Sequence, residues 1–196
     1  NTPILLDINN VNLVRDTTYS LNDDIQLKLN SYYGTDFFEF FVDSITDGSF
    51  ESDRIRFWKG GSYWGVVNIK FYKEGTLSIK YGNVHGSNDI NNIVYLYKSQ
   101  HVLKGNASDL RYDNNGNLEN ISSSQYTELS KSNANEVQTV EHISINAGDV
   151  ISIAEEYAIG AFYYMEFYNT PTQIYKEIET TILSPVKAAI LPLVKK

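Results

Sequence analysis

The sequence predicts an all-β protein, an antiparallel β-sandwich over residues 1–169 with a C-terminal helical appendage over residues 170–196. Short apolar runs recur along most of the chain at the close spacing that is typical of sandwiches and barrels. Asparagine pairs and glycines, which favour turns, separate these runs. A helical pattern is present only in the last 27 residues.

The composition argues against several classes of protein. A chain of 196 residues suits one domain, or one domain with an appendage, and a hydrophobic content of 42% is enough to form a core. Without cysteine there is no disulfide, no thiolate zinc site and no cysteine nucleophile. A net charge of -8 argues against a nucleic-acid partner, because phosphates are bound by clustered lysine and arginine.

The first half of the chain contains several strand patterns. Residues 4–8 and 11–14 are short apolar runs separated by asparagine. Residues 24–30 alternate between polar and apolar side chains, which predicts a half-buried strand. Residues 37–42 are densely aromatic and predict a central strand, and the Asp47-Gly48 pair after it predicts a tight turn.

The middle and the end of the predicted sandwich follow the same pattern. Residues 54–81 predict a meander, with strands at 54–58, 63–72 and 76–81 joined by two glycine-bearing turns. Another strand is expected at 90–97. Residues 104–135 are polar and predict a long loop containing at most a small hairpin. Three further strands, at 136–145, 150–154 and 161–168, close the series.

The last 27 residues begin with the signature of a helix N-terminus. Thr170 is a suitable N-cap, Pro171 suits the first helical position, and Gln173 completes a capping box. Pro185 is expected to end or kink this helix. Apolar residues recur every four positions, and we expect them to contact a neighbouring subunit: Ile174, Ile178, Ile182, Val186, Ile190 and Val194.

Motifs for catalysis and metal binding are not found. The three histidines lie in different segments, and no nucleophile elbow, phosphate-binding loop or dinucleotide-binding motif occurs. The oxygen-rich stretch 109–119 fails the register of a calcium-binding EF-hand loop, because Arg111 stands at a ligand position. We therefore predict a protein that is not an enzyme, with no catalytic residues, no metal and no cofactor.

Three aromatic residues flank a Lys-Gly-Gly-Ser turn in the middle of the chain. Trp58, Tyr63 and Trp64 could stack on the apolar face of a sugar ring. Polar side chains near them in sequence could bind its hydroxyl groups: Asp53, Arg56 and Asn68. The same aromatic residues could instead stabilise a sheet by packing across a hairpin, and this interpretation is favoured.

The region after residue 93 resembles a known family. Residues 143–153 contain a strand, a turn ending in Gly148-Asp149 and a second strand, and residues 162–167 form an aromatic closing strand. With residues 93–98 as an upstream core strand, this stretch resembles the last hairpin of trimeric jelly-roll heads, which occur in phage fibres and C1q/TNF-like domains. The resemblance, over residues 93–167, implies a jelly-roll-like sandwich and non-enzymatic roles in trimerisation, display and attachment. The C-terminal helical segment departs from such heads.

These observations lead to a functional expectation with two alternatives. The leading expectation is a structural or attachment subunit of a larger assembly, such as a phage or other virion surface protein, partnered by copies of itself or by other subunits. The location would then be extracellular or on the virion surface. The first alternative is a secreted carbohydrate-binding module that uses the aromatic residues. The second is a pore-forming toxin component that uses the C-terminal segment, although two prolines there disfavour membrane binding.

Overall fold

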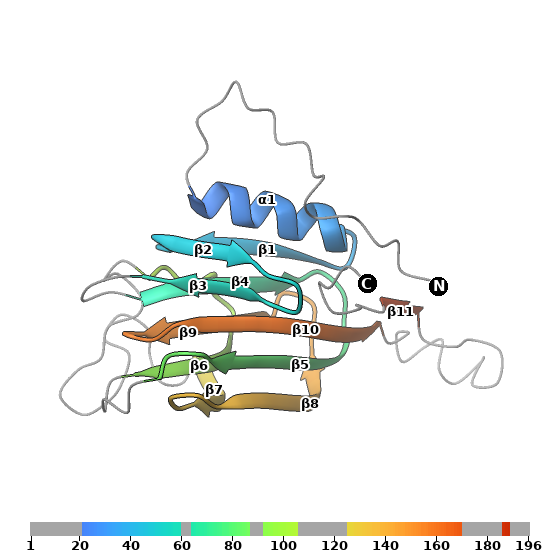
Figure 1. The fold of residues 1–196 in the computed structure, drawn as a ribbon. Helices are drawn as coiled ribbons and strands as arrows, with labels where there is room; N and C mark the ends of the chain where they lie inside the picture. The colour runs from blue at the N-terminus through green and yellow to red at the C-terminus, as the bar shows by residue number, and fades with distance from the viewer. Residues whose placement is uncertain (1–20, 60–63, 87–91, 106–124, 170–185, 189–196) are drawn as a thin grey trace, which may run out of the picture.

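The fold was analysed in a computed structural model, which describes residues 21–59, 64–86, 92–105, 125–169 and 186–188. Two antiparallel sheets pack face to face as a sandwich (Figure 1). Sheet A has the order β1 (Phe38–Asp43), β4 (Trp64–Phe71), β9 (Val150–Glu156), β6 (Ile93–Ser99) and β7 (Tyr126–Ser132). Sheet B has the order β2 (Asp47–Phe50), β3 (Ile55–Trp58), β10 (Gly160–Asn169), β5 (Gly75–Asn83) and β8 (Val137–Ile145), and β11 (Val186–Ala188) also pairs with β10. The predicted antiparallel sandwich is confirmed.

The strands from β3 to β10 pair in a nested order. β3 pairs with β10, β4 with β9, β5 with β8 and β6 with β7, and all four pairs are antiparallel. The segment from β3 to β10 is therefore one long hairpin, and its two arms stay paired while they fold back and forth between the sheets. The predicted meander over residues 54–81 is wrong, because β3 and β5 lie in sheet B while β4 lies in sheet A. Each glycine-bearing connection there crosses from one sheet to the other.

The core lies between the sheets and is rich in phenylalanine. β1 shows the period-2 pattern of a strand with one buried face, since Phe38, Phe40 and Val42 are buried while the residues between them are partly exposed. Phe71 of sheet A contacts Phe167 of sheet B, with 4.9 Å between ring centroids. Fully buried aromatic rings of this size contribute strongly to stability and hold the two sheets together without disulfides.

The strand predicted at residues 24–30 is wrong, because these residues belong to helix α1 (Leu21–Tyr33). Ile25 and Leu29 are buried in the core four residues apart, which is the spacing of one helix face. Leu27, the third apolar residue of the apparent alternation, is 37% exposed. The sequence satisfies both periods over this short stretch, and packing of the i, i+4 pair against the sandwich selects the helix.

Helix α1 lies along the β1 side of the sandwich, opposite β7 and β8 (Figure 1). Three of its polar side chains, again four residues apart, accept hydrogen bonds from backbone N–H groups of β1 and of the loop that follows it. The Asn30 side chain accepts from Phe40 N at 2.7 Å. Gln26 Oε1 accepts from Val42 N at 2.9 Å, and Asn22 Oδ1 accepts from Ile45 N at 2.7 Å. The helix thus covers an edge that would otherwise present unpaired backbone groups.

Three shorter predictions also differ from the structure. Asp47 and Gly48 lie in strand β2 rather than in a tight turn, and the turn that joins β2 to β3 follows Phe50. The polar stretch 104–135 contains β7, which pairs with β6 although its sequence is hydrophilic. Val186 lies in strand β11, not in a helix. The strands predicted at 4–8 and 11–14, and the rest of the C-terminal helical prediction, fall outside the described residues.

Candidate functional site

The two tryptophans of the predicted aromatic platform belong to different sheets. Trp58 ends β3 in sheet B, whereas Trp64 begins β4 in sheet A. Trp58 is 42% exposed and Trp64 is 3% exposed. Tyr63, the third member, lies outside the described residues. The two tryptophans therefore lie in different environments, one exposed and one buried.

Trp64 belongs to a second apolar cluster on the outer face of sheet A. Its ring stacks on Tyr95, with 5.4 Å between centroids. The chain that leaves β6 crosses this face and inserts Leu103, which is fully buried. The other buried members of the cluster are Val66, Tyr97 and Ala154. Trp64 thus packs in the interior, as the favoured interpretation of the aromatic residues expects.

Asn68 fastens the crossing segment to sheet A. Its side chain is fully buried, and its Nδ2 donates to Phe41 O at 3.1 Å and to Leu103 O at 2.9 Å. Its Oδ1 accepts from Leu103 N at 2.9 Å and from Ser152 Oγ at 2.7 Å. Because both polar atoms are bonded inside the protein, they are not available to hold a ligand. Gly105 continues the segment so close to β4 that an added Cβ would lie 1.7 Å from Trp64 O.

Trp58 lies on the opposite face of the molecule, in a group of outward-facing side chains. In β3, Ile55 and Phe57 are buried, so Arg56 and Trp58 point outward. The register of β2 places Asp47 directly across from Trp58 and Ser49 directly across from Arg56. A shallow pocket of about 60 Å³ opens between them. We call it the Trp58 pocket, and it is lined by Asp47, Gly48, Ser49, Arg56, Phe57, Trp58 and Ile159.

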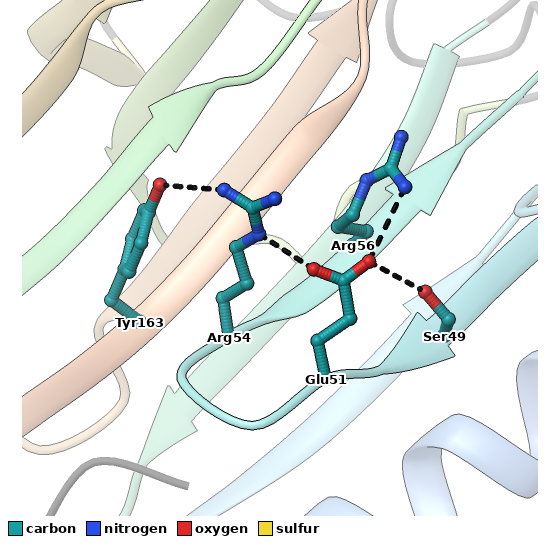
Figure 2. A network of polar contacts seen from close by, with 5 residues as sticks. All are labelled: Ser49, Glu51, Arg54, Arg56 and Tyr163. Carbon is teal, nitrogen blue, oxygen red and sulfur yellow. Dashed lines mark hydrogen bonds and ion pairs between the residues drawn. The ribbon is translucent and has the colours of Figure 1, made fainter. Parts of the chain in front are cut away.

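A polar network next to this pocket holds Arg56 in place (Figure 2). Glu51 accepts from Arg54 Nε at 2.8 Å, from Arg56 Nη1 at 3.2 Å and from Ser49 Oγ at 3.4 Å. Arg54 also donates to the Tyr163 hydroxyl at 3.5 Å. Burial acts to raise the pKa of Glu51, but the hydrogen bonds and charges of the two arginines outweigh it and lower the pKa. The carboxylate is therefore ionised near neutral pH and orients both guanidinium groups.

Tyrosines cover the outer face of sheet B along its central strand. Tyr164 and Tyr168, with Glu166 between them, alternate with the buried Met165 and Phe167, so all three point outward and are partly exposed. The Lys80 ammonium of β5 lies 4.9 Å from the ring centroid of Tyr163 and 6.0 Å from that of Tyr164. We call this surface the tyrosine face, and it comprises Lys80, Tyr163, Tyr164 and Tyr168.

Glu155 connects the two loops at the Trp58 end of the sandwich. It is fully buried, and its Oε1 accepts from Lys59 N at 2.6 Å and from Gly65 N at 3.0 Å. Its Oε2 accepts from Ala158 N at 3.1 Å. Burial raises the pKa of Glu155 to about 9, although the three backbone N–H groups act to lower it. Tyr157, in the loop that Glu155 holds, has a positive φ of 49° and is 44% exposed.

The structure brings together only part of the predicted ligand site. Trp58 and Arg56 line one pocket, whereas Asp53 lies in the exposed β2–β3 turn and Asn68 is buried on the other sheet. Asp47, Ser49 and Ile159 complete the pocket and were not predicted. Residues 47 and 49 lie directly opposite residues 58 and 56. This placement could be predicted only if the two segments were already known to pair.

Other predicted features remain outside this site. The C-terminal apolar side chains, from Ile174 to Val194, belong to residues whose side chains the structure does not describe, so their contact with a neighbouring subunit stays a prediction. Among the described residues, no three acidic or histidine side chains are grouped as metal ligands would be. In the part of the chain that the structure describes, no helix is long and apolar enough to cross a membrane.

No protein-family model matches the sequence, and no curated protein matches it.

Proposed function

We propose that this protein is a non-enzymatic structural or attachment subunit of a larger assembly and that its sandwich is a jelly roll. The nested pairing of β3 to β10 supports the jelly roll, because two Greek keys arise when one long hairpin folds across two sheets. The resemblance of residues 93–167 to trimeric heads supports the same fold. It also suggests the setting, which is an extracellular or virion surface.

A difference between the two outer faces of the sandwich carries the proposal. On the outer face of sheet A, the segment around Leu103 covers an apolar cluster, against which the partly exposed Tyr95 and Tyr126 also pack. On sheet B, Tyr164, Tyr168 and the cross-strand neighbour Lys80 keep partial exposure. Tyrosine and arginine are enriched where proteins bind proteins, because they combine a large apolar surface with a polar tip. The tyrosine face therefore suits a partner subunit.

We commit to a second copy of this chain as the partner. A sheet face contacting its equivalent on other copies gives a closed oligomer, which is the usual form of soluble assemblies. The central position of β10 in sheet B makes Tyr164 and Tyr168 the expected centre of the contact. Lys80 is held against the aromatic rings rather than pointing freely into solvent, so less side-chain entropy is lost on assembly.

Sedimentation velocity and light scattering of the full chain test this proposal. We expect an oligomer that persists at micromolar concentration, and a Tyr164→Ala/Tyr168→Ala variant that is monomeric with an unchanged β-type circular dichroism spectrum. A Leu27→Ala variant is the matched control, because Leu27 is 37% exposed but lies in α1, outside the tyrosine face. A wild-type chain that is monomeric at these concentrations would refute the proposal. So would a double variant that still forms the wild-type oligomer.

A further inference from the structure

We infer that the Trp58 pocket binds a neutral saccharide, whose ring stacks on the indole of Trp58 while Asp47, Ser49 and Arg56 hold its hydroxyl groups. The inference goes beyond the proposed assembly and does not depend on it. It rests on the geometry of two paired strands, on the chemistry of four side chains and on the local charge.

The register of sheet B arranges the four side chains as a square. Asp47 faces Trp58 and Ser49 faces Arg56 across the β2–β3 pair, and directly opposed side chains in such a pair are about 5 Å apart.

The four side chains supply what a sugar requires. An exposed indole offers a flat apolar surface for the C–H groups on one face of a pyranose ring. The Asp47 carboxylate accepts hydrogen bonds, the Arg56 guanidinium donates them and the Ser49 hydroxyl does both. A carboxylate and a guanidinium side by side match neighbouring hydroxyl groups, each of which donates and accepts. Few polar groups converging beside an aromatic surface are typical of ligand sites.

Arg56 is especially suited to this role because it is already ordered. Glu51 holds its Nη1 at 3.2 Å, so a ligand does not have to immobilise a long side chain (Figure 2). Its Nε is buried and has no hydrogen-bond partner within the protein, but the side chain as a whole is 38% exposed, so outer N–H groups of the guanidinium are open to a ligand. The guanidinium therefore retains hydrogen-bonding capacity while its orientation is fixed.

The local charge selects neutral over anionic sugars. Two carboxylates, Glu51 and Asp47, balance the two arginines, and the whole chain carries a net charge of -8. An acidic sugar would therefore gain no net attraction from these side chains and would be disfavoured by the charge of the chain as a whole. The pocket volume of about 60 Å³ admits a hydroxyl or hydroxymethyl group, so the ring itself lies on Trp58 outside the pocket. Such a shallow contact predicts weak binding, with a Kd on the order of 1 mM.

Saccharide binding and assembly use different residues along β10. Ile159 of the pocket wall precedes this strand, and Tyr164 and Tyr168 follow it by five and nine residues. In an extended chain these separations correspond to roughly 16 and 30 Å. Failure of one proposal is therefore distinguishable from failure of the other. Trp58→Ala should leave the oligomer intact, and Tyr164→Ala/Tyr168→Ala should leave saccharide binding intact.

Tryptophan fluorescence provides a direct test, because the chain has two tryptophans and only Trp58 is exposed. We would titrate the full chain with glucose, galactose, mannose and N-acetylglucosamine, and measure emission wavelength and quenching by acrylamide. At least one of these sugars is expected to give a saturable blue shift and to protect about half of the emission from quenching. No saturable change with any of the four would overturn the inference.

Variants separate a specific site from general adsorption. With the sugar that binds, Asp47→Ala should weaken binding at least about tenfold, which is the loss expected for a hydrogen bond to a charged group. Trp58→Ala should abolish saturation-transfer NMR signals from the sugar while the folded spectrum persists. Tyr72→Ala is the matched control, because Tyr72 is a similarly exposed aromatic residue, at 39%, outside the pocket. Equal binding by wild type and Trp58→Ala, or tighter binding of N-acetylneuraminic acid than of the neutral sugars, would refute the site.

Discussion

The side chain of Asn30 pairs with the backbone of Phe40 through two hydrogen bonds, one accepted from Phe40 N at 2.7 Å and one donated to Phe40 O at 3.0 Å. This is the pattern that a neighbouring strand would form with an edge residue. A helix side chain here replaces a backbone, and one helical turn earlier Gln26 accepts a single hydrogen bond from Val42 N. Sheet A is therefore protected at β1 by a helix whose amide spacing matches every second residue of the strand.

Removing this protection is expected to expose the edge. Asn30→Ala leaves two partly buried backbone groups of Phe40 without their partner, and we expect the free energy of unfolding to fall by about 2 kcal/mol. The Gln26→Ala/Asn30→Ala double variant is expected to aggregate on heating through strand addition at β1. Chemical denaturation and thioflavin binding measure the two effects. Leu27→Ala, on the exposed side of the same helix, should change neither, and aggregation at a similar rate in that control would contradict the assignment.

Asn68 is expected to be the strongest single polar determinant of stability. Asn68→Ala removes four buried hydrogen bonds and frees the segment around Leu103. We expect a loss of at least about 3 kcal/mol, together with a red shift of Trp64 emission as water reaches the second cluster. Denaturation followed by fluorescence in a Trp58→Phe background isolates the Trp64 signal. Ser152→Ala, which removes one of these bonds, should cost about 1 kcal/mol. Equal losses for the two variants would show that the segment is not held by Asn68.

Gly105 is required by the closeness of two backbones. Gly105→Ala places a methyl group 1.7 Å from Trp64 O, and since neither backbone can move freely the expected loss is about 3 kcal/mol. Gly86→Ala is the matched control, since the nearest atom to its added Cβ, Asn135 Nδ2, is 3.7 Å away. This control should be neutral or stabilising by up to about 1 kcal/mol. Thermal denaturation of both variants distinguishes them, and similar midpoints would contradict the close approach.

Stability is expected to fall as pH rises above the ordinary range of a carboxyl group. Burial raises the pKa of Glu155 from 4.5 to about 9, so between these values the folded protein keeps a proton that the unfolded chain releases. Because the unfolded state binds fewer protons, the contribution of Glu155 decreases by up to about 1.4 kcal/mol per pH unit in this window. Glu155→Gln should remove this slope.

A second glutamate, Glu156, contributes to the pH dependence of stability only in the lower part of that pH range. Burial raises the pKa of Glu156 to about 7, so its contribution has the same sign but ends at a lower pH. Glu156→Gln is expected to flatten the pH dependence only below about pH 7, whereas Glu155→Gln flattens it up to about pH 9. Urea denaturation at intervals from pH 5 to about pH 9 measures the slopes. A Glu155→Gln variant whose stability relative to wild type does not change with pH would contradict the prediction.

Much of the sandwich could be predicted from the sequence, because buried and partly exposed side chains alternate along several of its strands. The burial pattern of β1 and the buried positions of β10 follow from residues 37–42 and 161–168. The helix could not be predicted in this way, because residues 24–30 satisfy the period of a strand as well as that of a helix. β7 was missed because an edge strand with a polar sequence is held by its ladder to β6 rather than by a buried face.

The candidate site was harder to predict than the fold. Closeness in sequence placed Trp58 and Trp64 together, but the chain changes sheet between them, so one is exposed and the other is buried. Asn68 looked like a surface hydrogen-bonding residue because its partners, among them Leu103, are distant in sequence. The residues that do share a pocket with Trp58 come from β2 and from the start of β10, and only the strand register reveals them.

The nested pairing of the strands has a consequence for the order of events during synthesis. Ile55 in β3 pairs with Phe162 in β10, which leaves the ribosome about 100 residues later. At a synthesis rate of about 5–20 residues per second, the first arm of the hairpin waits for roughly 5–20 s before its partner exists. The tip, where β6 pairs with β7, can close first, and closure then proceeds outward to β3 and β10. A nascent chain of this protein therefore carries apolar unpaired strands until β10 has been synthesised, and a chaperone that binds such strands has its longest opportunity at β3 and β4.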